Sequence, residues 1–146
     1  MGLIYVCLGS KMKKFAFFFL FSCIIQKKTI LLQRKTAKSK NMATNSVIKQ
    51  IRQLGERIIP AGGNLWLYGS RARGDYRSDS DWDLLVLVDK DKIQWTDYDN
   101  YAYPFTELGW NIGQTINPVL YSKQEWEARN FSPFYHNVQN DKKVIL

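Results

Sequence analysis

The first 41 of the 146 residues contain no acidic side chain, and the rest of the chain contains no cysteine. Nine of the 21 lysines and arginines lie in residues 1–41, which leaves residues 42–146 with twelve basic and thirteen acidic residues. The net charge of +8 therefore belongs to the N-terminal segment, and the charge of the remainder does not indicate a nucleic-acid-binding surface. Because Cys7 and Cys23 both precede residue 42, disulfides and cysteine-based metal sites are excluded from residues 42–146.

Histidine is also scarce, since His136 is the single example in the sequence. Histidine-rich zinc sites and Ser-His catalytic groups are therefore poor candidates. The chain is 45% hydrophobic and 14% aromatic, which excludes disorder of the whole protein, and its length suits one domain.

Residues 1–41 form a basic and apolar extension, in which lysines at 11, 13 and 14 precede an apolar run at 15–25. This run is shorter than the roughly 20 residues that a membrane-spanning helix needs. The extension is interpreted as a mis-assigned start or a disordered, dispensable tail, because Met42 and the residues after it resemble an ordinary beginning. An export or membrane signal and a basic arm that binds nucleic acid are the alternatives. Residues 42–146 are expected to form the working domain, in the cytoplasm and without membrane contact.

Apolar periodicity across residues 42–146 predicts a small α/β (α+β) domain with helices and strands in the order α-β-α-β-α-β-α. Pro118 indicates an edge strand or a bulge, and the apolar run 84–88 indicates a strand buried on both faces. The predicted elements are a helix from a cap at Asn45 or Ser46 to about Ile59, a strand at 64–68, a short helical turn within 71–80, a strand at 82–88, a helix at 96–110 kinked at Pro104, a strand at 113–122, a helix at 123–129 and a short helix after Pro133.

Asp81 and Asp83 stand two residues apart at the head of the second strand, so their side chains point to the same side. Two carboxylates on one face repel each other without a counterion. Mg²⁺ prefers oxygen ligands of this kind and usually adds phosphate oxygens of a substrate. The pair is therefore a candidate metal site.

A glycine and a serine, Gly69 and Ser70, close the first strand. Glycine allows close approach of the main chain to a phosphate, and a serine at the start of a helical turn offers a hydroxyl and free N–H groups. Arg71 and Arg73 would add positive charge against a triphosphate. Either motif alone is typical of an ordinary cap or turn, but their combination at this spacing indicates a nucleotide site.

The stretch GSRARGDYRSDSDWDLLV at 69–86 resembles the active-site signature of the minimal nucleotidyltransferases of the DNA polymerase beta superfamily. The similarity covers roughly residues 46–122 and implies the polymerase-beta-like fold, with a small mixed sheet flanked by helices. It implies that Asp81 and Asp83 bind Mg²⁺ and that the residues around Gly69, Ser70 and Ser80 bind a nucleoside triphosphate. Such enzymes transfer a nucleoside monophosphate, here expected to be AMP from ATP, to a hydroxyl group and release pyrophosphate.

The family pattern has a third acidic residue on the next strand, and here Asn117 occupies that position. No aspartate or glutamate lies between Glu107 and Glu125. An amide oxygen can bind a metal but cannot accept the proton of the attacking hydroxyl. Two hypotheses follow: an active enzyme in which Asn117 is part of the site, or a catalytically weakened, antitoxin-type protein that binds a partner. A carboxylate from the following helix is a further alternative, and the candidates are Asp97, Asp99 and Glu107.

Aromatic residues gather between the second and third strands, and core packing, base stacking and contact with a partner are all consistent with them. These residues are Tyr98, Tyr101, Tyr103, Phe105 and Trp110. The resemblance implies a small helical protein of the HEPN type as partner.

Overall fold

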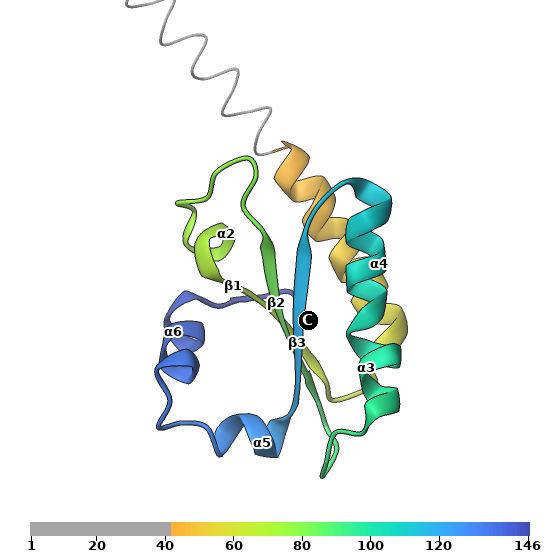
Figure 1. Cartoon of the computed structure of the whole chain (residues 1–146), viewed down its shortest axis with the longest axis vertical. Helices are drawn as coiled ribbons and strands as arrows, with labels where there is room; N and C mark the ends of the chain where they lie inside the picture. Colours follow the sequence, from red (N-terminus) through yellow and green to blue (C-terminus); the bar gives the residue numbers. More distant parts are fainter. Residues whose placement is uncertain (1–41) are drawn as a thin grey trace, which may run out of the picture. The chain divides into compact units, whose positions relative to one another are not determined.

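The computed structural model describes residues 42–146, and the interpretations of residues 1–41 lie outside this part of the chain. A four-stranded sheet in the order β3-β2-β1-β4 carries helices on both faces (Figure 1). The predicted α+β class, with a small mixed sheet flanked by helices, is confirmed. Within residues 42–146, no helix is both long enough and apolar enough to cross a membrane.

The sheet is built around β2 (Trp82–Val88), which pairs antiparallel with β1 (Asn64–Tyr68) and parallel with β3 (Ile116–Ser122). The short β4 (Lys143–Val144) pairs antiparallel with β1. Residues 84–88 are buried, as the apolar run predicted, because β2 is central and covered on both faces. Pro118 lies on the edge strand β3, where its missing N–H disrupts no ladder, and the pairing of β3 with β2 continues past it without a bulge.

The helices differ from the prediction at four places. The turn predicted within 71–80 already begins at Gly69, and the helix predicted at 123–129 ends at Glu127. Residues 42–45 are already helical, so the first helix includes the predicted caps and continues to residue 58. The helix predicted at 96–110 is two helices, and Pro104 lies in the first turn of the second, where a residue without an N–H breaks no hydrogen bond. The helices after the first are α2 (Gly69–Arg73), α3 (Trp95–Tyr101), α4 (Tyr103–Ile112), α5 (Lys123–Glu127) and α6 (Pro133–Asp141).

Two further differences concern strands. Gly113 adopts a left-handed conformation with φ +65° and ends α4, so β3 begins at Ile116 rather than at residue 113. The strand β4 was not predicted, because two exposed residues carry no alternation of apolar and polar side chains.

Each face of the sheet has its own apolar core. Ile51 and Phe105 pack with Leu84 and Val86 on one face, and Trp126 and Val138 pack with Leu85 and Leu87 on the other. The second face, beneath α5 and α6, is the one on which Asp83 lies, because alternate residues of a strand share a face.

Candidate active site

Three polar side chains lie beside one another across the sheet. Asp83 of β2 pairs with Tyr68 of β1 in the antiparallel register and with Asn117 of β3 in the parallel register. Paired residues of neighbouring strands point to the same face. Asp81 lies just before β2 and accepts a hydrogen bond from Asn117, so the structure brings Asp81, Asp83 and Asn117 together.

The Asn117 amide lies within reach of both carboxyl groups. Its Nδ2 donates a hydrogen bond to Oδ2 of Asp81 at 3.1 Å. Burial raises the pKa of Asp83 above its ordinary value, hydrogen bonding from Asn117 opposes this rise, and the charge of Asp81 adds to it. The pair therefore consists of one exposed and one half-buried carboxylate whose repulsion a bound cation would relieve.

The main chain at Gly69 lies close to the Asp83 carboxylate. Its φ of +72° lies in the left-handed region, and an added Cβ would stand 2.6 Å from Oδ2 of Asp83. Only glycine accommodates both this positive φ and this close approach to Asp83 without strain. The Gly-Ser turn, with Ser70 in the first turn of α2, thus lies directly against the half-buried Asp83.

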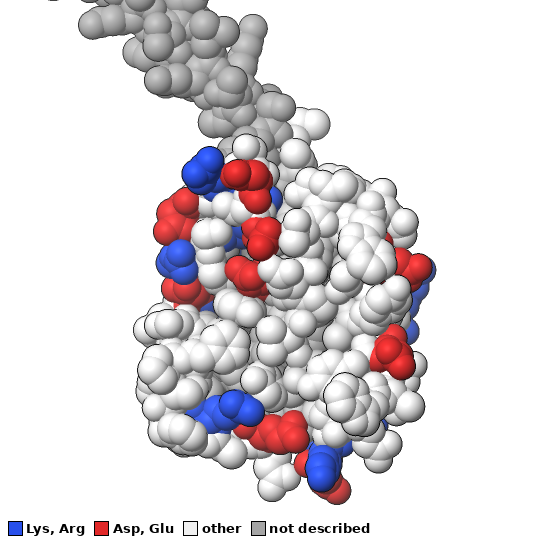
Figure 2. Space-filling view, in the orientation of Figure 1, with Lys and Arg blue, Asp and Glu red and all other residues white. Residues whose placement is uncertain are grey.

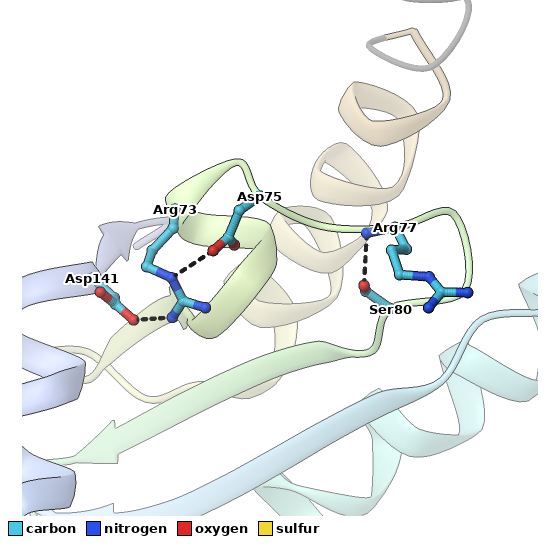
Figure 3. Close-up of polar contacts among 5 residues, drawn as sticks. All are labelled: Arg73, Asp75, Arg77, Ser80 and Asp141. Carbon is cyan, nitrogen blue, oxygen red and sulfur yellow. Dashed lines mark hydrogen bonds and ion pairs between the residues drawn. The ribbon is translucent and has the colours of Figure 1, made fainter.

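Arg73 and Ser80 lie around this centre with partners of their own. Arg73 forms ion pairs with Asp75 at 3.2 Å and with Asp141 of α6 at 2.5 Å (Figure 3). Its charge also lowers the pKa of Asp83, although less than burial raises it. The Ser80 hydroxyl accepts a hydrogen bond from the Arg77 main-chain N–H at 2.9 Å and closes a turn before Asp81.

Arg71 differs from the other predicted nucleotide-binding residues because it is buried. Its Nε and Nη2 donate to main-chain carbonyl oxygens within residues 78–81. These donors are therefore directed to the protein's own loop rather than left open toward a phosphate.

Neither α3 nor α4 supplies the missing third acid. Asp97 is buried, lies 2.6 Å from Nζ of Lys90, and accepts a hydrogen bond from the Gln94 main-chain N–H at 2.9 Å. Asp99 and Glu107 are exposed on their helices. Across residues 42–146, no group of three or more histidine, cysteine, aspartate or glutamate side chains could hold a metal, so the alternative that one of these acids joins Asp81 and Asp83 is wrong.

Tyr68 is a neighbour of the candidate site that the sequence analysis did not identify. Burial raises the pKa of its phenol to about 12, and the neighbouring charge of Asp83 contributes. The phenol is therefore neutral at physiological pH, and the strand register places Tyr68 beside Asp83. Its place as the last residue before the Gly-Ser turn was the available signal, but the strand register is what puts it beside Asp83.

The arrangement fits a hard divalent cation. Asp81 and Asp83 offer carboxylate oxygens, and Nδ2 of Asn117 donates a hydrogen bond to Asp81 beside them. Such oxygen donors suit Mg²⁺, which binds to proteins through one or two carboxylates and completes its shell with water and phosphate. Figure 2 shows acidic side chains gathered over α2 and the loop before β2, with basic ones among them.

The aromatic residues of α3 and α4 divide between core and surface. Phe105 is fully buried, which confirms core packing for that residue, whereas Tyr98, Tyr103 and Trp110 are exposed. A groove of about 880 Å³ lies elsewhere, between the start of α3 and α5, and neither Asp81 nor Asp83 lines it.

Comparison with known proteins gives three results. The family model of the nucleotidyltransferase domain matches residues 46–144. A protein of Methanocaldococcus jannaschii with the provisional name protein adenylyltransferase is 32% identical over 79 residues, which are 54% of this chain and 73% of the relative. A crystal structure from Sulfolobus solfataricus, provisionally described as a nucleotidyltransferase, has a similar fold, with 20% identity, a TM-score of 0.50 and coverage of 73% of this chain and 85% of that one.

A chain in a crystal structure of a toxin-antitoxin with AMP-PNP is also similar. It shows 21% identity and a TM-score of 0.49, over 68% of this chain and 72% of that chain.

Proposed function

Because this chain belongs to the nucleotidyltransferase domain family, we propose that it transfers a nucleoside monophosphate from a nucleoside triphosphate to a hydroxyl group. ATP is the proposed donor, AMP the transferred group and Mg²⁺ the metal. The observation that carries the proposal is the convergence of Asp81, Asp83 and the Gly69–Ser70 turn at one end of the sheet.

Each of these groups has a separate task in the proposed reaction. Asp81 and Asp83 hold the divalent cation, and the Gly69–Ser70 turn holds the phosphates through its main-chain N–H groups and the Ser70 hydroxyl. Gly69 is suited to this because it lacks a Cβ on the side that faces Asp83. A bound Mg²⁺ would stabilise negative charge on the phosphates and lower the pKa of the attacking hydroxyl.

In the transfer step, the acceptor hydroxyl oxygen forms a bond to the α-phosphorus of ATP. The bond between the α-phosphorus and the oxygen that bridges it to the β-phosphorus breaks, and pyrophosphate leaves with that electron pair. The hydroxyl proton passes to solvent, because the Asn117 amide cannot accept it. General-base catalysis contributes about 10²–10⁴-fold, so the proposed enzyme is slow compared with one that has a third carboxylate.

We propose a protein side-chain hydroxyl as the acceptor. The name of the Methanocaldococcus jannaschii relative supports this choice. A small helical HEPN-type protein, the partner implied by the resemblance, is the candidate acceptor to test first.

The direct test is transfer of label from ATP radiolabelled at the α-phosphate, with Mg²⁺ and with candidate partner proteins. The wild-type chain should label a partner and release pyrophosphate, whereas Asp81→Asn and Asp83→Asn should abolish both. Asp79→Asn is the matched control, because Asp79 lies in the same loop, is exposed and pairs with Arg77 rather than with the site.

Asn117 supports a second candidate function, a catalytically weakened protein that acts by binding a partner. It predicts no label transfer by the wild-type chain, and partner binding that Asp81→Asn leaves intact. Label transfer that depends on Asp81 and Asp83 would reject it.

A further inference from the structure

Arg71 is a buried cation of α2, whereas the other arginines of α2 and of the loop that follows it are exposed. Its exposed fraction is 6%, whereas the side chains of Arg73 and Arg77 are 46% and 84% exposed. Burial of a guanidinium is costly unless its donors are paired. The partners of Arg71 therefore indicate what its burial accomplishes.

The Arg71 guanidinium binds the main chain that leads into β2. Its Nε donates to the carbonyl oxygens of Ser80 at 2.8 Å and Asp81 at 3.2 Å, and its Nη2 lies 3.4 Å from that of Ser78. Because Arg71 stands two residues after Gly69, one side chain connects the Gly-Ser turn to the main chain of the metal-binding aspartate.

Aromatic rings hold this guanidinium in place. Its central carbon lies 4.2 Å from the ring centroid of Trp82 and 5.1 Å from that of Tyr76. Trp82 is itself held at the entrance of β3, where its Nε1 donates to the Gln114 side chain at 3.0 Å and its main-chain N–H donates to the Thr115 carbonyl at 2.8 Å. The position of Arg71 is thus set from β3 as well as from α2.

We propose that Arg71 is a positioning residue, which fixes the main chain of Ser80 and Asp81 and so places the Asp81 carboxylate opposite the Gly69–Ser70 turn. Ser80 and Asp79 contact Arg77 within the loop, and Arg73 of α2 pairs with the exposed Asp75 at the start of the loop, whereas Arg71 reaches the carbonyl oxygens of Ser80 and Asp81. This inference rests on the proposed function, since it concerns the geometry of the same metal site.

The test compares Arg71→Gln and Arg71→Lys with Arg77→Gln, which removes the same charged group from an exposed position in the loop that follows α2. Binding of Mn²⁺ alone, followed by electron paramagnetic resonance, measures the site without turnover. The Arg71→Gln variant should bind Mn²⁺ about 10- to 100-fold more weakly, as is common when a residue that supports a metal ligand is lost. Arg71→Lys should lose most of this affinity too, because a lysine ammonium lacks the planar fork that spans two carbonyls. Arg77→Gln should stay within about twofold of the wild type.

Label transfer and amide hydrogen exchange complete the test, at a temperature where circular dichroism shows each variant to be folded. Transfer should fall through a higher KM for Mg·ATP, and the Ser80 amide, which donates to the Arg77 carbonyl oxygen at 3.2 Å, should exchange faster in the Arg71 variants. If Arg71→Gln does not fold, Arg71→Lys carries the same measurements. A folded Arg71 variant with wild-type Mn²⁺ affinity would overturn the inference and leave the proposed function intact. A wild-type chain that binds no Mn²⁺ and transfers no label would overturn both.

Discussion

Replacing Gly69 with alanine is expected to move the Asp83 carboxylate out of its position in the site. A Cβ at residue 69 would lie 2.6 Å from Oδ2 and 3.5 Å from Cγ of Asp83. Non-bonded heavy atoms are comfortable at about 3.5–4.0 Å, so the carboxylate must shift by about 1 Å. The Asp83 side chain can rotate to make this shift, and that rotation would move its carboxylate away from the proposed metal position.

Two magnitudes follow from this geometry. The φ of +72° makes alanine unfavourable at residue 69 by about 1–2 kcal/mol of folding free energy. A misplacement of about 1 Å at a reacting centre costs about 10²-fold in rate. Gly69→Ala should therefore remain folded but transfer label about 100-fold more slowly.

Gly113→Ala separates the two effects. Gly113 has a similar φ of +65°, but a Cβ there would meet nothing within 4 Å. Both variants should lose similar stability in urea unfolding, and only Gly69→Ala should lose activity and Mn²⁺ affinity. Equal transfer rates for the two variants, at equal folded fraction, would refute the argument that the absence of a Cβ at residue 69 positions Asp83.

Three further substitutions test the charges of the domain. Asn117→Asp should raise label transfer by about 10²–10⁴-fold because it provides a proton acceptor, and it should lower the melting temperature measured without Mg²⁺. Asn130→Asp, at an exposed position, is the control. An unchanged transfer rate in Asn117→Asp would contradict the role proposed for the amide. Asp97→Asn should lower the free energy of unfolding, measured in urea at pH 7, by about 1–2 kcal/mol, because it removes the ionic partner of Lys90 and weakens the start of α3. An unchanged free energy of unfolding would show that this ion pair is unimportant for stability. Burial raises the pKa of Asp83 in the folded state above its ordinary value of 3.8. Without metal, the stability that this group contributes is therefore lost as the pH rises from 3.8 through the folded-state pKa. Asp83→Asn should remove this decrease and melt at a higher temperature at pH 7; identical pH profiles for the two proteins would contradict the sign.

Local pattern was enough to predict the elements that carry the motif. A run of apolar residues at 84–88 indicates a buried strand wherever it lies, and the alternation of a strand places Asp81 and Asp83 on one side. The Gly-Ser turn before them is also local, because φ and steric freedom belong to single residues.

Proximity across the sheet required the folded chain. Asn117 stands beside Asp83 because β3 pairs in parallel with β2 in one register, and a shift of one residue would turn Asn117 to the opposite face. The antiparallel pairing of β2 with β1 likewise makes Tyr68 a neighbour of Asp83.

The role proposed for Arg71 also could not be predicted from the sequence. In the sequence, an arginine after a Gly-Ser pair resembles a phosphate ligand, since charge alone is visible there. Its burial depends on Trp82, and Trp82 depends on contacts with residues 114 and 115, more than thirty positions along the chain. Strand and turn propensities act over a few residues and can be recognised in a sequence, whereas burial and partner choice depend on which distant segments pack together.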